Sequence, residues 1–137
     1  KKLRKVINQR VKNFESLKNF FNKLNKYFKV PNQYKFVKTA WLAYPIVIKN
    51  SKINRRNLQI FLEENGIQTR TIFTGNIMRQ PIMKNKKYKK NKDSSKMSDD
   101  VMKNGLLIGC HHGLTKVEIK HIFSTFVKFL KKYKLQN

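Results

Sequence analysis

The side chains that could do chemistry gather in two short segments. In the first, Arg70 and Arg79 flank the run Thr74-Gly75-Asn76. Gly and Asn tolerate positive φ, so the chain can turn sharply there and expose backbone N–H groups. Fixed N–H donors beside the planar fork of an arginine form a good site for an anion. The alternative is that both arginines are simply solvated at an ordinary turn.

The second segment is the pair His111-His112, which lies between Gly109 and Gly113. Adjacent residues point to opposite faces of a strand and lie about 100° apart on a helix, so one metal ion could not easily take both imidazoles. The flanking glycines would let one imidazole approach a ligand closely. The alternative is that both histidines have a structural role or face solvent. Cys110 is expected to be a small buried apolar residue rather than a nucleophile.

Charge dominates the composition. The 137 residues carry 32 Lys and Arg against 7 Asp and Glu, a formal net charge of +25. Most of the basic residues are Lys, whereas proteins that recognise the edges of nucleic-acid bases favour Arg. Because Asn, Ile and Phe are also abundant, as A/T-rich codons would produce, we interpret much of the charge as codon bias. A stand-alone basic module that binds nucleic acid or another polyanion, or a membrane surface, stays open.

Two elements precede the first chemical segment. Residues 1–28 predict a long helix, because apolar residues recur at steps of three and four, and Pro31 follows its end. Residues 40–49, AWLAYPIVIK, predict a strand rich in β-branched and aromatic residues. Pro45 within it predicts an edge position or a bulge, since proline donates no ladder hydrogen bond. No apolar run reaches the ~20 residues of a membrane span, so no membrane-spanning segment is predicted.

A helix and a second strand come next. Asn54 is the predicted N-cap of the helix, and Gly66 is the predicted residue that closes it. Residues 67–73, IQTRTIF, predict a strand that runs into the Thr74-Gly75-Asn76 turn.

The remainder predicts a loop, a short helix, a strand and a final helix. Residues 84–95 are lysine-rich and should form a loop, because like charges repel. Residues 99–103 predict the short helix and residues 106–108 the strand. Thr115 and Glu118 have the spacing of a capping box at the start of the last helix. This order predicts an α+β (α/β layer) fold, with a small sheet flanked by helices.

Residues 66–81, GIQTRTIFTGNIMRQP, resemble the C-terminal domain of the DegT/DnrJ/EryC1/StrS family. Its members are PLP-dependent enzymes that act on nucleotide-linked keto sugars. Residues 5–21, 41–48 (WLAYPIVI), 55–70 (RRNLQIFLEENGIQTR) and 104–119 (NGLLIGCHHGLTKVEI) follow the family's order as well. The resemblance therefore covers nearly the whole chain.

The resemblance implies a domain organisation. Residues 1–30 would be a long connecting helix, and residues 31–137 the small C-terminal α/β domain of a fold-type I PLP enzyme. The family's large PLP-binding domain is absent from this sequence, as is its internal Lys, or the His that replaces it in dehydratases. The chain is therefore expected to be a fragment or remnant that alone binds no cofactor and catalyses nothing.

The resemblance also narrows the subgroup. Aminotransferases of the family usually read "IHYP.PLH.QP" after "GI.T", whereas Ile72 and Met78 stand here in place of the two histidines. The pattern "TR…GN..RQP", with "G.HH" at Gly109 to His112, is more similar to the 3-dehydratases of NDP-4-keto-6-deoxyhexoses. The implied parent reaction is C3 deoxygenation of such a sugar in lipopolysaccharide or O-antigen biosynthesis. A sugar aminotransferase of the same family is the alternative.

For the full-length parent, the resemblance implies PLP or PMP as cofactor, a nucleotide-linked keto sugar as substrate, a homodimer and a cytoplasmic location. On this interpretation a membrane, nucleic acid and a metal ion are not expected partners. No catalytic residue is predicted in this chain, and the lysine-rich run at residues 84–92 would meet a diphosphate or solvent. The predicted substrate-binding residues are Arg70, Thr74, Gly75, Asn76, Arg79, His111 and His112.

Overall fold

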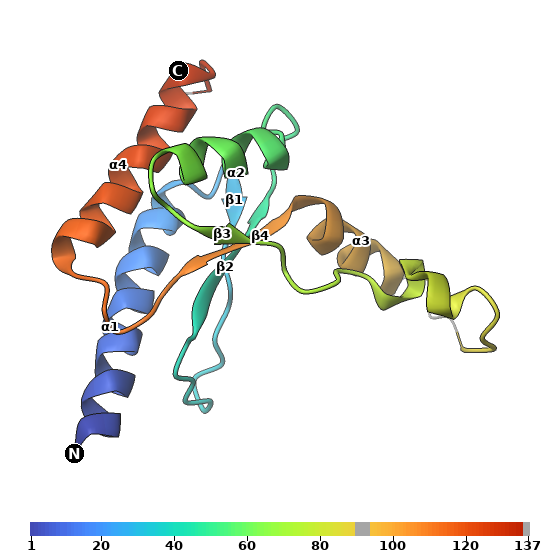
Figure 1. Ribbon diagram of the computed structural model, residues 1–137, viewed down its shortest axis with the longest axis horizontal. Helices are drawn as coiled ribbons and strands as arrows, with labels where there is room; N and C mark the ends of the chain where they lie inside the picture. The colour runs from blue at the N-terminus through green and yellow to red at the C-terminus, as the bar shows by residue number, and fades with distance from the viewer. Residues whose placement is uncertain (90–93, 136–137) are drawn as a thin grey trace.

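The computed structural model describes residues 1–89 and 94–135 (Figure 1). The predicted long helix is confirmed as α1 (Lys2–Lys23), which ends earlier than expected. Phe28 and Lys29 form a short strand, β1 (Phe28–Lys29), that the sequence did not indicate. Pairing with a distant strand therefore overrides the helical spacing at the end of the first predicted element.

The sheet has four antiparallel strands in the order β1-β2-β4-β3. β1 reaches only Val47 and Ile48 of its neighbour, so Pro45 lies where that strand has no partner on the β1 side. This is the edge position that proline requires. The three remaining strands are β2 (Ala43–Ile48), β3 (Thr69–Arg70) and β4 (Gly105–Gly109).

One face of the sheet is buried and the other is partly exposed. Tyr44 and Ile46 of β2 pair with Ile108 and Leu106 of β4, and all four side chains are fully or almost fully buried on the same face. Alternation along a strand puts their neighbours on the opposite face, which is half-exposed. The molecule is therefore a two-layer α+β fold, which confirms the predicted fold class.

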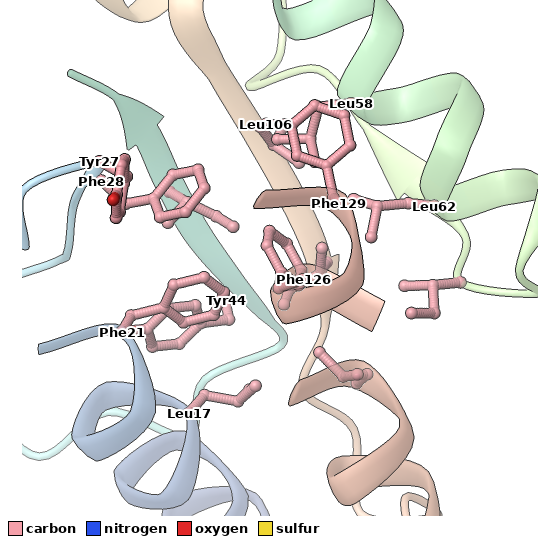
Figure 2. Packing of buried hydrophobic residues seen from close by; sticks show 14 of the residues in the cluster. Leu17, Phe21, Tyr27, Phe28, Tyr44, Leu58, Leu62, Leu106, Phe126 and Phe129 are labelled. Atoms are coloured by element: carbon pink, nitrogen blue, oxygen red, sulfur yellow. The ribbon is translucent and has the colours of Figure 1, made fainter. Parts of the chain in front are cut away.

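Three helices cover the buried face with aromatic and aliphatic side chains (Figure 2). They are α1, α2 (Arg55–Glu64) and α4 (Lys116–Lys132). Phe21 of α1 lies at the centre, with its ring centroid 4.9 Å from that of Phe126 and 5.5 Å from that of Tyr44. α1 therefore packs into the same core as α4. The domain boundary predicted at residue 30 stays a prediction.

Local signals set the ends of two helices, as predicted. Asn54 caps α2, since its Oδ1 accepts a hydrogen bond from the backbone N–H of Asn57. Gly66 follows the helix with φ +74°. At α4, Thr115 Oγ1 accepts from the Glu118 N–H, and Glu118 Oε2 accepts from the Thr115 N–H. These bonds to Thr115 lower the pKa of Glu118.

The chain between β3 and β4 leaves the layered core as a projection, which we call the arm and define as residues 71–89 and 94–104 (Figure 1). It contains two short 3₁₀ helices, η1 (Ile77–Arg79) and η2 (Pro81–Met83), and the helix α3 (Ser94–Asn104). The predicted strand at residues 67–73 is shorter than expected, because Phe73 and Gly75 take positive φ and turn the chain away from the sheet.

The prediction for the arm's second half needs correction. The predicted loop at residues 84–95 is wrong for Ser94 and Ser95, which belong to α3. The helix expected at residues 99–103 is correspondingly longer. Residues 90–93 of that predicted loop lie outside the described residues. Among the helices of the described chain, none has the length and apolar character needed to cross a membrane.

Candidate functional site

The Thr74-Gly75-Asn76 turn is built against α3. Gly75 has φ +71°, and a Cβ at this position would lie 2.5 Å from Cβ and Cγ of Met102. Glycine is therefore required twice, for its backbone conformation and for the close approach of α3. Asn76 is buried, and its Oδ1 accepts from the backbone N–H of Met78, which caps η1.

Arg79 is held in a two-bond ion pair with Asp99 of α3. Its Nε donates to Asp99 Oδ1 at 3.0 Å, and its Nη2 donates to Asp99 Oδ2 at 2.6 Å. Asn76 Nδ2 donates to the same Oδ1 at 2.8 Å. The hydrogen bond from Arg79, followed by that from Asn76, lowers the pKa of Asp99 to about 2. Asp99 therefore occupies one edge of the arginine fork with a permanent negative charge.

Arg70 and Thr74 face solvent. Arg70 is exposed at the end of β3, and its guanidinium has no hydrogen-bond or ion-pair partner among the described residues. The Thr74 carbonyl accepts from Gln80 Nε2 at 3.1 Å, which leaves its exposed hydroxyl unengaged. Arg70 is thus the less constrained of the two arginines that the sequence singled out.

The two histidines lie at the opposite end of β4. The strand runs from Gly105, beside the arm, to Gly109, and His111 and His112 come after it. At ~3.3 Å per residue, roughly 20 Å of chain separates Gly105 from His111. The seven predicted residues therefore form two groups rather than one cluster.

Asn13 fixes the histidine loop to α1. Its buried Nδ2 donates to the carbonyl of His111 at 2.8 Å and to that of Leu114 at 3.4 Å. The His111 Nδ1 accepts from the Gly113 N–H at 3.2 Å, so Nε2 carries the proton of the neutral ring. Both imidazoles are exposed.

His111, Glu118 and His121 line a hollow of about 300 Å³. His121 Nε2 lies 2.8 Å from the carbonyl oxygen of Asn65, so one ring nitrogen is already engaged. Within residues 1–89 and 94–135 no group of three or more His, Cys, Asp and Glu side chains could hold a metal ion. Cys110 is buried, and burial raises the pKa of its thiol to about 11. The structure thus confirms it as a buried residue, and it is protonated at neutral pH.

Sequence reasoning missed the acidic partners of the arm. Asp99 organises the Arg79 network, and Asp100 Oδ2 lies 3.2 Å from Lys29 Nζ while its Oδ1 accepts from Asn104 Nδ2. The hydrogen bond from Asn104 and the contact with Lys29 lower the pKa of Asp100. One signal was present: two adjacent aspartates stand out in a chain with only 7 acidic residues.

The described residues offer no enclosed lysine to which PLP could be attached covalently. The family's covalent attachment needs a lysine enclosed within a site, where burial can keep it unprotonated. In the described part of the chain every lysine side chain is exposed except Lys18, which is half-buried and lies 4.0 Å from Glu15. No step that involves this cofactor is therefore derived from this chain.

Comparison with known proteins decides the family. The sequence profile of the DegT/DnrJ/EryC1/StrS aminotransferase family matches residues 1–127. The chain belongs to this family. Among curated proteins, the lipopolysaccharide biosynthesis protein RfbH of Salmonella typhimurium is 31% identical over 129 residues. That alignment covers 93% of this chain and 29% of RfbH.

Solved structures share the fold, and one of them is named as a DegT/DnrJ/EryC1/StrS aminotransferase. The GDP-4-keto-6-deoxy-D-mannose-3-dehydratase of E. coli, solved with bound hydrated PLP, is 30% identical with a TM-score of 0.75. An aminotransferase of this family from Brucella abortus is 19% identical with a TM-score of 0.72, a likeness that shows the fold alone. Each match covers 90% of this chain and 31% of the solved chain, so this chain spans about a third of its relatives' length.

Proposed function

We propose that this chain is the C-terminal domain of a PLP- or PMP-dependent enzyme that acts on nucleotide-linked 4-keto-6-deoxy sugars, and that the reaction is removal of the 3-hydroxyl. The observation that carries the proposal is the segment from Arg70 to Arg79, with its Gly75 turn and its Arg79–Asp99 pair. The segment lies in a chain that is 30% identical to a protein named as a 3-dehydratase. The name of RfbH supports a role in lipopolysaccharide biosynthesis.

In this proposal the arm presents donors to the sugar nucleotide. The side chains of Arg70 and Thr74 are exposed and unengaged among the described residues, so they can donate to phosphate or sugar oxygens. Asp99 and Asn76 hold Arg79 in one orientation, which leaves its Nη1 as a fixed donor. Cofactor, substrate, homodimer and cytoplasmic location belong to the proposal for the full-length enzyme.

The histidine loop has the weaker claim to the substrate. It lies beyond the far end of β4, and His111 Nδ1 already accepts from the Gly113 N–H. His111 Nε2 and the exposed ring of His112 remain available for hydrogen bonding. We therefore assign the main contacts with the sugar nucleotide to the arm. The histidine loop could contact the same ligand only at a part distant from the one that the arm binds.

A chimera tests the proposed reaction. Residues 1–127 replace the aligned segment of the E. coli GDP-4-keto-6-deoxy-D-mannose-3-dehydratase, and mass spectrometry follows the loss of the 3-hydroxyl from the substrate that names this enzyme. The control carries the aligned segment of the Brucella abortus aminotransferase, which shares the fold at 19% identity. We expect the first chimera to be at least about tenfold faster, equivalent to ~1.4 kcal/mol in activation free energy.

Absorbance of bound PLP shows whether the host part of each chimera is intact. If both chimeras retain PLP and are equally slow in 3-dehydration, the proposed reaction is wrong. The host supplies the large domain in both chimeras, so a difference between them reports how well each C-terminal domain fits the 3-dehydratase substrate.

A further inference from the structure

A second polar hollow, of about 540 Å³, lies at the start of α2. Residues 48–56 form most of its wall, and Lys103 and Asn104 at the end of α3 complete it. None of the seven predicted substrate-binding residues lines it. This hollow is therefore separate from the segment that carries the proposed function.

Its lining is strongly cationic. Among the described residues, no Asp or Glu contributes to the wall, and only Ile48 and Ile53 of the wall are aliphatic. Arginine is scarce in this sequence, yet two adjacent arginines are placed here. The cationic members are Lys49, Lys52, Arg55, Arg56 and Lys103.

Two of these cations hold the wall together. Arg55 Nη1 donates to the carbonyl of Met102 at 2.6 Å and to that of Gly105 at 3.3 Å, which ties α2 to the junction of α3 and β4. Lys49 Nζ donates to the carbonyl of Asn25 at 2.8 Å. The Arg55 bonds thus hold the start of α2 against the end of α3 at one side of the hollow.

The other three cations are available to a ligand. The side chains of Lys52 and Arg56 are exposed and have no hydrogen-bond or ion-pair partner among the described residues. Lys103 is exposed as well, and its charge acts on Asp100, which already accepts from Asn104 and Lys29. Three positive charges therefore border one cavity without a carboxylate inside it.

We propose that this hollow binds a small anion with two linked phosphate groups, either free diphosphate or the diphosphate of a nucleoside diphosphate. Several cations around one cavity favour a multiply charged anion, because each contributes a charge-assisted hydrogen bond. The volume is in the ~300–1,000 Å³ range of small-molecule sites, which exceeds the need of a single phosphate. The concave shape favours a small anion over a nucleic acid, which needs an extended surface. This inference does not depend on the proposed sugar chemistry.

Titration of the full chain with three probes tests the proposal. Inorganic phosphate, inorganic diphosphate and GDP are added to ¹⁵N-labelled protein, and amide shifts are followed by NMR. We expect saturable shifts concentrated at residues 50–57 and 103–104, with diphosphate binding at least about tenfold more tightly than phosphate. A tighter response to GDP assigns the site to a nucleoside diphosphate, and an equal response assigns it to free diphosphate.

A matched pair of variants separates a site from bulk charge. Lys52→Gln/Arg56→Gln/Lys103→Gln removes three charges from the hollow and should weaken diphosphate binding at least about tenfold. The control variant, Arg4→Gln/Lys5→Gln/Lys12→Gln, removes the same residue types from the exposed face of α1. It should change the affinity for diphosphate by less than about twofold.

Equal weakening by both triple variants, or shifts spread over lysines throughout the chain, would overturn the proposal. So would the absence of saturable binding. If the hollow variant unfolds by circular dichroism, Arg56→Gln alone replaces it, since the Arg56 side chain is exposed and has no hydrogen-bond or ion-pair partner among the described residues. This single change should weaken binding at least about threefold, and no change would equally contradict the site.

Discussion

The layered core and the arm are held by different kinds of contact. In the core, Phe21 lies against the rings of Phe28, Tyr44 and Phe126, and all four side chains are buried. Within the arm, the Arg79–Asp99 pair and the close packing of Gly75 on Met102 hold the turn against α3. Polar contacts tie the arm to the core, from Lys29 to Asp100 and from Arg55 to the carbonyl of Met102. Apolar packing therefore determines the fold, and a few polar contacts position the segment that we assign to substrate.

This difference has a dynamic consequence. Segments with few buried apolar contacts open locally at lower free energy than the core. The arm exposes Phe73 and Ile82, whereas the buried faces of α1 and α4 exclude water. We therefore expect hydrogen exchange to separate the two regions, with fast exchange in the arm and slow exchange in the core.

Removal of a central ring should break the core. Phe21→Ala leaves a cavity among three aromatic rings and should lower the free energy of unfolding by about 3–5 kcal/mol, measured by urea denaturation. Phe36→Ala is the matched control, because Phe36 is 88% exposed and its loss should change stability by less than about 0.5 kcal/mol. Similar losses in the two variants would mean that the core is not where stability resides.

A methyl group at Gly75 should loosen the arm alone. Gly75→Ala combines an unfavourable φ, which costs about 1–2 kcal/mol, with a 2.5 Å approach to Met102. Amide exchange should accelerate at residues 71–80 and stay unchanged in α1.

Gly66→Ala is the control, because Gly66 has φ +74° but no atom within 4 Å of an added Cβ. It should therefore be the milder change of the two. If Gly75→Ala is no worse than Gly66→Ala, α3 does not pack closely on the turn.

Loss of the ion pair should free Arg79 without affecting the core. Asp99→Asn removes the charge that pairs with Arg79, so the guanidinium N–H signals should broaden and exchange faster in NMR spectra. Asp100→Asn removes the same charge from the neighbouring residue, whose contacts are with Lys29 and Asn104. An equal effect of both changes on Arg79 would contradict a specific role for Asp99.

The same pair predicts a small acid sensitivity. The pKa of Asp99 is lowered to about 2, so its contribution is complete above the unfolded-state pKa of ~3.9 and disappears as the pH falls through about 2. The Arg79 Nε–H signal should follow this titration, and Asp99→Asn should abolish the dependence. A midpoint near pH 4 in the native chain would show that the pair does not persist in solution.

Local signals in the sequence predicted local structure well. The caps at Asn54 and Thr115 depend on residues within a few positions, and both are confirmed. β1 was missed because its two residues are strand only through pairing with Val47 and Ile48. The Arg79–Asp99 pair was missed because 20 residues separate its members and only α3 brings them together.

The separation of the histidines from the arm illustrates the same limit. The number of residues between Arg79 and the histidines does not predict how far apart they lie, because the length of β4 determines that distance. Gly109 to Gly113 was recognised as a distinctive pattern, yet its structural tie runs to Asn13 in the first helix. Contacts across the fold therefore decide which predicted residues can act together.

The most direct test of the account is the effect of Arg70 on substrate affinity. In the chimera with the E. coli dehydratase, Arg70→Gln removes an exposed donor from the arm, and Arg4→Gln removes an exposed arginine from α1. We predict that Arg70→Gln raises KM for GDP-4-keto-6-deoxy-D-mannose at least about tenfold, the loss expected for one charged hydrogen bond. Arg4→Gln should leave KM unchanged. An unchanged KM in Arg70→Gln would contradict the assignment of the arm to substrate.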